Sequence, residues 1–134
     1  MKKRERERRA GAKVVGILDS GERKVFETGA QRDTQEGKYR PELISPVFVR
    51  RLGNWLALGA AKYEARNWEK GLPMDRSMGS LLRHLNQYRE GERDEDHLAA
   101  AACNLMFLIH TGEMIERGRL PGELDDVPEY FKKG

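Results

Sequence analysis

The chain has 134 residues, 38% of them hydrophobic and 35% charged, and a formal net charge of +3. This length fits one domain, and a domain of this size buries roughly two-thirds of the surface that its unfolded chain exposes. Residues 1–10 carry six Lys or Arg and two Glu, so residues 11–134 together carry a net charge of −1. The basic character therefore belongs to a tail, which we expect to be flexible over residues 1–12. Nucleic-acid contact is expected only through this tail.

Cys103 is the single cysteine, which excludes an intrachain disulfide and a multi-cysteine metal site. Its apolar neighbours predict a buried, inert thiol. We find no uninterrupted apolar run of about 18 residues, the length that spans a bilayer, and no signal-peptide core after the charged N-terminus. These features predict a cytoplasmic protein.

Two β-favouring runs, 13–18 and 24–28, flank the turn-forming segment 19–22 and predict a short N-terminal hairpin or extended arm. The polar stretch that follows, up to Pro46, is expected to form a structured loop. Ser45 and Pro46 are typical of a helix start, because Ser caps free amides and Pro suits the first helical position.

Three helices are predicted after this point. Apolar residues at helical spacing predict the first over about 46–65, and Gly and Pro residues at 71–73 end it. Asp75 is the expected cap of the second helix, which Gly91 ends. The third should begin within 94–96, where acidic side chains favour the helix dipole, and should run to Gly118.

The predicted fold is therefore mainly α, an antiparallel helical bundle formed by a single helical domain over residues 13–134. The remaining C-terminal residues are expected to form an extended tail that packs on a neighbour. Because the apolar residues must be concentrated on few faces, self-association is plausible from composition.

Asn104 is the one polar residue between Leu98 and Ile109. A buried amide whose hydrogen bonds are unmade costs about 1–3 kcal/mol, so Asn104 must have partners. His97, seven residues earlier, falls on the same stripe of the helix. If the second and third helices form an antiparallel hairpin, His84 and Asn104 lie at similar heights, with His97 nearer the acidic turn.

Imidazole, carboxylate and amide groups that converge on one groove suit a divalent metal. We expect Mg²⁺ or Mn²⁺, with Zn²⁺ less favoured. The candidate metal ligands are His84, Asp96, His97 and Asn104. The candidate catalytic carboxylates are Glu92, Asp94 and Glu95. Alternatively, His84 and Asn104 simply bond to each other, and the acidic residues only cap the helix.

The segment 62–71, KYEARNWEKG, offers different chemistry. Its cations suit phosphate, Asn67 offers an amide, and Trp68 offers a face on which a base can stack. The candidate nucleotide-binding residues are Lys62, Arg66, Asn67, Trp68, Lys70 and Arg83. Alternatively, Trp68 is a core anchor and the cations are solvated.

Four segments together resemble a known family. They are GAQRDTQEGKYRPELISP, KYEARNWEKGLP, LLRHL and EDHLAAAACNLMFLIHTGEMIERGRLPGELDD. As an ordered set they resemble the bacteriophage family described as dATP/dGTP diphosphohydrolase, N-terminal domain, which is similar to the MazG-like all-α NTP pyrophosphohydrolases. The similarity covers about residues 28–128.

The resemblance implies metal-dependent hydrolysis of a purine deoxynucleoside triphosphate to the monophosphate and pyrophosphate. It further implies adjustment of the nucleotide pool by a phage, a location in the host cytoplasm, and a dimer or tetramer. In MazG-like enzymes, carboxylates on two antiparallel helices hold Mg²⁺, which activates water.

This chain departs from the MazG-like pattern. Asn104 falls where that pattern has Asp, Ala101 where it has Glu, and His84 near a position of Glu. An ExxE and ExxD pair is present elsewhere, at Glu113, Glu116, Glu123 and Asp126, but Gly and Pro interrupt its second half, and we interpret it as coincidence. Either the histidines and the 92–96 acids form a variant metal site, or the chain is a non-catalytic phage accessory protein that binds nucleotide, nucleic acid or a protein partner.

Overall fold

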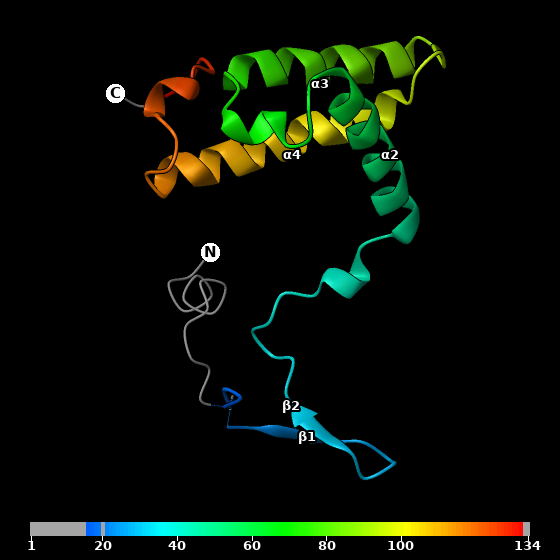
Figure 1. Cartoon of the computed structure of the whole chain (residues 1–134), viewed down its shortest axis with the longest axis vertical. Helices are drawn as coiled ribbons and strands as arrows, with labels where there is room; N and C mark the ends of the chain where they lie inside the picture. Colours follow the sequence, from blue (N-terminus) through cyan, green and yellow to red (C-terminus); the bar gives the residue numbers. More distant parts are fainter. Residues whose placement is uncertain (1–15, 20, 133–134) are drawn as a thin grey trace. The chain divides into compact units, whose positions relative to one another are not determined.

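The computed structural model describes residues 16–19 and 21–132, and the chain divides into two compact units, residues 1–40 and 41–134 (Figure 1). The expected basic tail over residues 1–12 lies outside the described residues. Within the described residues the helices belong to the second unit, and the structure confirms a mainly helical fold with one small hairpin.

The hairpin of the first unit lies later in the sequence than predicted. Strand β1 (Arg23–Val25) pairs antiparallel with β2 (Gln31–Asp33). The strands are not connected at the predicted segment 19–22, where Asp19 accepts hydrogen bonds from the amide of Gly21 and from the guanidinium of Arg23. The chain instead reverses over residues 26–30, where two backbone hydrogen bonds close the turn.

Helix α2 (Pro46–Lys62) begins as predicted, because the Ser45 hydroxyl accepts a hydrogen bond from the amide of Phe48. It ends three residues earlier than predicted. The backbone after it takes up positive φ angles at Glu64 (152°) and Arg66 (61°), which no helix continues. A short 3-10 helix, η2 (Asn67–Lys70), follows.

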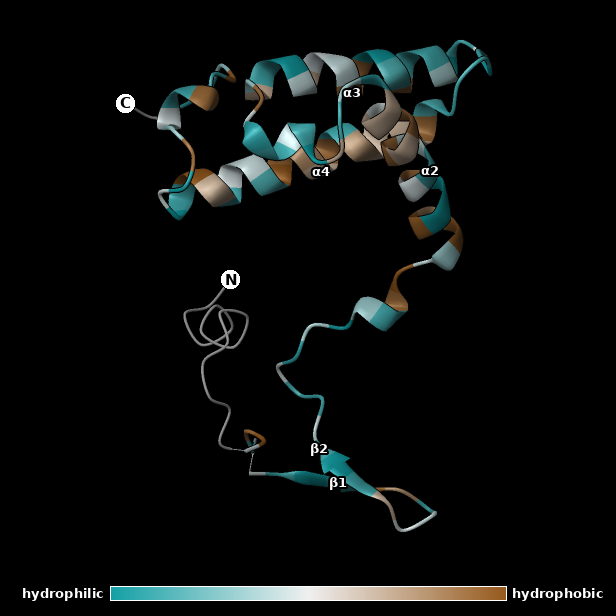
Figure 2. Ribbon diagram, viewed as in Figure 1, coloured by the Kyte–Doolittle hydropathy of each residue, from teal (hydrophilic) through white to brown (hydrophobic). Residues whose placement is uncertain are grey.

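Helix α3 (Met74–Arg89) and helix α4 (His97–Glu116) form an antiparallel hairpin joined by residues 90–96, and α2 crosses it and packs on α4 (Figure 1). Asp96 caps α4 by accepting a hydrogen bond from the amide of Ala99, as predicted for this segment. Figure 2 shows α3 as mainly hydrophilic, whereas hydrophobic residues recur along α4.

The core lies on α4 and consists largely of small residues. The buried hydrophobic side chains among the described residues are Ala99, Ala100, Ala101, Cys103 and Leu108. Small side chains let neighbouring helices approach closely, so α4 is the helix that both α2 and α3 contact. The predicted burial of Cys103 is confirmed, and burial raises the pKa of its thiol to about 11.

The prediction that Asp75 caps α3 is wrong. Asp75 lies inside the first turn, and its backbone amide donates to Oδ1 of Asp126, 2.8 Å away and far along the sequence. The segment after α4 therefore folds back on its own chain, through the short 3-10 helix η3 (Gly122–Leu124). There an ideal Cβ at Gly71 would lie 2.7 Å from Cδ1 of Leu124.

Helix α4 has the length and hydropathy of a membrane span, with a mean hydropathy of 1.4 in its most apolar window. Asn104 and His110 interrupt this helix, so it still contains no uninterrupted apolar run of about 18 residues. The same helix carries the core and pairs with α3 through Asn104 and Ser80. A core helix meets these criteria as well as a span does.

Candidate active site

Two histidines meet at the end of the α3–α4 hairpin near the connecting loop. Nδ1 of His84 on α3 lies 3.0 Å from Nδ1 of His97 on α4. His97 is 1% exposed, and its Nε2 lies 2.8 Å from Oδ1 of Asp94. The ring of Trp55 on α2 and the ring of His84 are nearly perpendicular, at a centroid distance of 5.7 Å. The pair is thus enclosed by three helices.

The hydrogen-bond partners of the two imidazoles determine which ring nitrogen atoms carry a proton. The bond from His97 is the main cause that lowers the pKa of Asp94, so this carboxylate is ionised and can only accept. His97 Nε2 is therefore the donor. In the neutral pair, His97 then accepts at Nδ1 from His84 Nδ1–H, and the lone pair of His84 lies on Nε2. Burial is the main cause that lowers the pKa of His84, which favours this neutral state.

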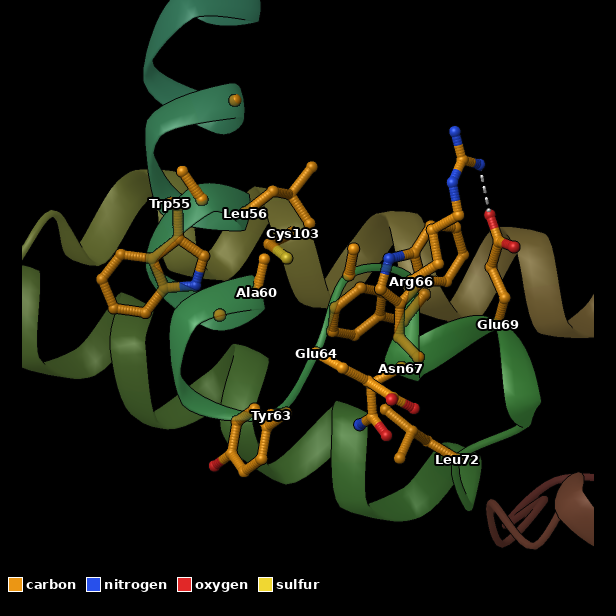
Figure 3. Close-up of a pocket in the computed structure, with 16 residues that line it drawn as sticks. Trp55, Leu56, Ala60, Tyr63, Glu64, Arg66, Asn67, Glu69, Leu72 and Cys103 are labelled. Carbon is orange, nitrogen blue, oxygen red and sulfur yellow. Dashed lines mark hydrogen bonds and ion pairs between the residues drawn. The ribbon is translucent and has the colours of Figure 1, made fainter.

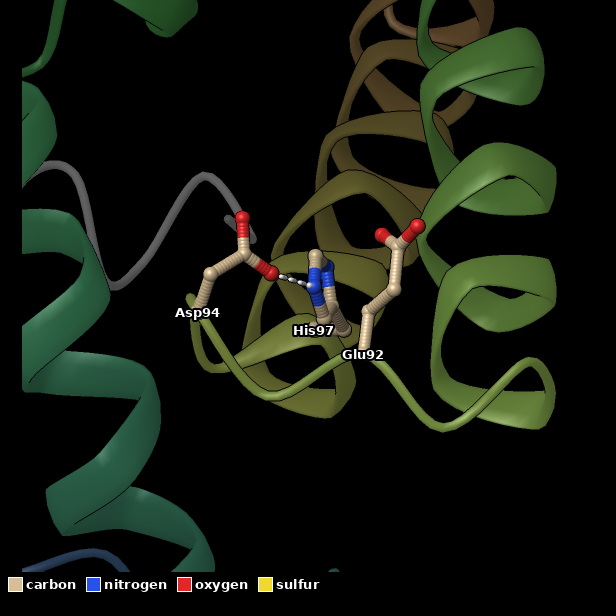
Figure 4. Close-up of side chains that lie close together, drawn as sticks. All are labelled: Glu92, Asp94 and His97. Carbon is tan, nitrogen blue, oxygen red and sulfur yellow. Dashed lines mark hydrogen bonds and ion pairs between the residues drawn. The ribbon is translucent and has the colours of Figure 1, made fainter.

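Glu92, Asp94 and His97 form a group of possible metal ligands (Figure 4). Their ligand atoms lie within 4.8 Å of one another, and Glu92 and Asp94 are exposed while His97 is buried. Figure 4 shows the two carboxylates on either side of the His97 ring. The loop between α3 and α4 supplies both carboxylates, and the first residue of α4 supplies the imidazole.

Other residues expected at a metal site have different partners. The Asp96 carboxylate is bound by the Arg51 guanidinium through two hydrogen bonds, of 2.6 and 2.9 Å. This contact is the main cause that lowers the pKa of Asp96. The amide nitrogen of Asn104 donates to Ser80 Oγ and to the carbonyl of Ala100.

The pairing of α3 and α4 corrects one expectation. His84 lies opposite His97, and Asn104 lies opposite Ser80, whereas the sequence predicted His84 and Asn104 at similar heights. Relative to that expectation, the partner of His84 lies seven residues earlier on α4 and the partner of Asn104 lies four residues earlier on α3, which is about two turns and one turn of helix.

A cavity of about 440 Å³ adjoins the metal-ligand group and is rich in charge. Its charged lining comprises Arg51, Lys62, Asp94, Glu95 and Asp96, so two cations face three carboxylates. We call it the charged cavity. Asp94 belongs to both this cavity and the metal-ligand group. Among the described residues Lys62 forms no ion pair, and its Nζ lies 5.2 Å from the ring centre of Tyr63.

A second cavity, of about 710 Å³, lies between α2, η2 and α4 (Figure 3). We call it the aromatic cavity, because its lining includes Trp55, Tyr63, Trp68 and Phe107. Trp68 stacks on Phe107 at a centroid distance of 5.1 Å and lies nearly perpendicular to His110 at 4.8 Å. Figure 3 shows Trp55 and Tyr63 on one side of this cavity and Asn67 and Leu72 on the other.

The wall of the aromatic cavity contains an unusual stretch of backbone. Glu64 and Arg66 both line it, and both are non-glycine residues at positive φ. Such conformations cost of order 1–3 kcal/mol each and are concentrated at functional sites. The predicted segment 62–71 therefore contains strained backbone that forms part of the cavity wall.

The structure separates the six predicted nucleotide-binding residues. Arg66, Asn67 and Trp68 line the aromatic cavity, and Lys62 lines the charged cavity. Arg66 is paired with Glu69 at 3.1 Å, and Lys70 is paired with Glu64. Arg83 lies on α3, where its guanidinium is close to the backbone of Gly79.

Sequence reasoning missed the contribution of α2. Arg51, Asn54, Trp55 and Gly59 line one or both cavities, yet in the sequence they fall in an ordinary amphipathic helix. The available signal was weak: two glycines, at 53 and 59, interrupt a helix that has good start and stop residues.

Comparison with known proteins gives one match. The chain matches the model of a family described as dATP/dGTP diphosphohydrolase, N-terminal, over residues 28–118. No curated protein and no solved structure gives a significant match. The matched residues include the histidine pair and all the lining residues of both cavities. Because the match spans more than half of the chain, this chain belongs to the dATP/dGTP diphosphohydrolase N-terminal family.

Proposed function

We propose that this chain hydrolyses purine deoxynucleoside triphosphates to the monophosphate and pyrophosphate with the help of a divalent metal ion. The family supplies the reaction class. The observation that carries the proposal is the position of Asp94, which belongs both to a group of metal-ligating side chains and to a cavity with cations that suit phosphate.

The donor set of Glu92, Asp94 and His97 fits a divalent metal ion. Carboxylates suit Mg²⁺ and Mn²⁺, and an imidazole ligand favours Mn²⁺ over Mg²⁺. A ligating His generally donates its other N–H to a partner that orients the ring. With a metal ion in place of the Nε2 proton, His97 would carry its proton on Nδ1 and donate it to His84 Nδ1, the reverse of the bond in the metal-free pair. When bound, the metal would neutralise phosphate charge and lower the pKa of a water ligand.

The charge of the cavity explains why a metal would be needed. Its two cations and three carboxylates leave a net charge of −1, which repels a triphosphate. A divalent ion held by Glu92 and Asp94 would make the net charge at the edge of the cavity positive. Glu92 and Asp94 would therefore hold the metal, and Lys62 would hold the phosphates beside it.

The chain's own residues would then position the reactants. Lys62 holds the phosphates, Trp68 offers a face to the base, and Asn67 offers an amide to its edge. Glu95 lines the charged cavity, and its carboxylate has no hydrogen-bond partner among the described side chains, so it is available to take a proton from water. Water adds to the α-phosphorus, and the bond to the bridging oxygen of the leaving pyrophosphate breaks.

The test uses the purified full chain with each of the four deoxynucleoside triphosphates and Mn²⁺ or Mg²⁺, with products separated by anion-exchange chromatography. We expect monophosphate and pyrophosphate in equal amounts, fastest from dATP or dGTP. Glu92→Gln should reduce the rate at least about a hundredfold, as the loss of a metal ligand does. The matched control Glu116→Gln, an exposed carboxylate at the end of α4, should retain it.

Two outcomes would overturn the proposal. Binding of nucleotide without any product would favour the non-catalytic accessory role. Release of nucleoside and inorganic triphosphate would place the attack at a different bond.

We also propose that the chain self-associates and acts in the cytoplasm on a phage-altered nucleotide pool. Support for association comes from large apolar side chains that remain exposed on α2 and α4, among them Val47, Leu58, Leu105 and Ile109. Light scattering on the purified chain at several concentrations tests this, and a monomer at all of them would contradict it.

A further inference from the structure

The aromatic and charged cavities meet on α2. Trp55 and Gly59 line both of them, and as residues four apart they lie one above the other on the same face of the helix. The two cavities therefore share a wall one helical turn long. The two cavities remain on different sides of the chain at the end of the helix, where Lys62 lines the charged cavity and Tyr63 lines the aromatic cavity.

The chemistry of the two cavities is complementary to the two halves of a nucleotide. Stacked and edge-on aromatic rings line the larger one, which suits a flat heterocycle. Charged groups line the smaller one, and it adjoins the metal-ligand group through Asp94. A ligand that uses both must cross α2 between them.

Gly59 lies at this crossing, and the protein's own packing does not require a glycine there. An ideal Cβ at Gly59 would have no atom within 4 Å. A glycine in a helix interior costs about 1 kcal/mol relative to alanine, so its presence calls for a reason outside the helix. Close approach of a ligand to the backbone is such a reason.

We propose that a deoxynucleoside triphosphate binds across α2, with its base in the aromatic cavity, its phosphates in the charged cavity, and its sugar over Gly59. This inference rests on the proposed function and deepens it. It assigns phosphate binding to Lys62, with Asn54 in the same cavity. It also makes Gly59 a determinant of nucleotide affinity, because the absence of a side chain there leaves room for the sugar.

The test measures binding of an α,β-methylene dATP or dGTP analogue with Mn²⁺ by calorimetry. Gly59→Leu fills the crossing and should weaken binding at least about tenfold. The matched control is Ala61→Leu, on the same helix but exposed, which should bind as the unmodified chain does. Circular dichroism checks that both variants fold. Gly59→Ala, a milder change that should raise the melting temperature, should still weaken binding by about threefold.

A second arm uses Mn²⁺ with inorganic tripolyphosphate, which can occupy only the charged cavity. Its affinity should fall in Lys62→Gln and should be unchanged in Gly59→Leu and in Asn67→Ala. If Lys62→Gln leaves tripolyphosphate affinity unchanged, the phosphates are not where we place them.

The remaining outcomes separate the two proposals. Suppose that the unmodified chain hydrolyses nucleotides and that a folded Gly59→Leu variant binds the analogue as tightly as Ala61→Leu. The nucleotide then does not bind across α2 over Gly59, and the proposed function stands. If Gly59→Leu changes the association state by light scattering along with affinity, Gly59 faces a second copy, and the inference is overturned. If the unmodified chain neither binds nor hydrolyses any nucleotide, both proposals fall.

Discussion

The Nδ1 atoms of His84 and His97 lie 3.0 Å apart, joining α3 to α4 near the loop that connects them. Only one of the two nitrogens can carry the proton, so the pair shares a single hydrogen bond. The buried member, His97, also contacts the exposed carboxylate of Asp94. The contact thus links the packing of the helix hairpin to the chemistry of the candidate metal site.

His97→Ala should destabilise the fold even without metal. The substitution removes a fully buried ring and leaves the His84 Nδ1 group without its partner, which costs about 2–3 kcal/mol. Urea unfolding in the presence of a chelator measures this. Glu92→Gln alters an exposed side chain in the same cluster and should change the free energy of unfolding by less than about 0.5 kcal/mol. Equal effects of the two variants would contradict the structural role of His97.

Mn²⁺ should raise the melting temperature of the unmodified chain, and a chelator should reverse this rise. A ligand that binds only the folded state stabilises it by mass action. The shift should be larger with Mn²⁺ than with Mg²⁺, because an imidazole is among the ligands. Glu92→Gln should reduce the shift and Glu116→Gln should retain it. A shift that is the same in both variants would place the metal elsewhere.

Acid should remove the stabilisation that Asp96 contributes. The hydrogen bond from Arg51 is the main cause that holds the pKa of Asp96 below its ordinary value of 3.8. A carboxyl whose pKa is lower in the folded state stabilises the fold above its unfolded pKa, and this contribution is lost as the pH falls through the folded pKa. Asp96→Asn should therefore be less stable than the unmodified chain near neutral pH, and the difference should shrink below pH 3.8. Chemical unfolding over this range measures the difference, and a gap independent of pH would exclude the mechanism.

Asp126→Ala should destabilise α3 from a distance. Its carboxylate accepts a hydrogen bond from the backbone amide of Asp75, and loss of a helix N-terminal cap typically costs about 1 kcal/mol. Asp126→Asn keeps an acceptor oxygen and should recover most of the loss. Thermal unfolding compares them with Asp125→Ala, a neighbouring exposed carboxylate. If the Asp125 and Asp126 variants behave alike, the cap is not made in solution.

Gly71→Ala should destabilise the chain, whereas Gly53→Ala should not. Gly71 has a φ of 106°, and a Cβ there would meet Leu124 at 2.7 Å, so strain and a clash together cost about 1–3 kcal/mol. At Gly53 a Cβ enters open space in a helix, where alanine is favoured by about 1 kcal/mol. Opposite signs in urea unfolding are expected. A neutral Gly71→Ala would mean that the C-terminal segment does not pack there.

Local patterns accounted for much of the helical architecture. Ser45 and Pro46 start α2 as predicted, and the acidic run before His97 caps α4. These signals work because capping and helical periodicity depend on residues within a few positions of one another. A local signal failed where a residue far away in the sequence made the same interaction. Asp75 has the chemistry of a helix cap, but the carboxylate of Asp126 accepts the hydrogen bond from an amide at the start of α3.

The types of residue at the candidate site were also evident in the sequence, because two histidines and a run of carboxylates stand out next to an apolar helix. Which of these residues contact one another was not evident in the sequence. Tertiary packing placed His84 against His97, left Asn104 with Ser80, and tied Asp96 to Arg51 of α2. It also brought Trp55 and Gly59 between two cavities. These contacts depend on the register and crossing of helices, which are set by how small side chains on α4 pack against two neighbours at once.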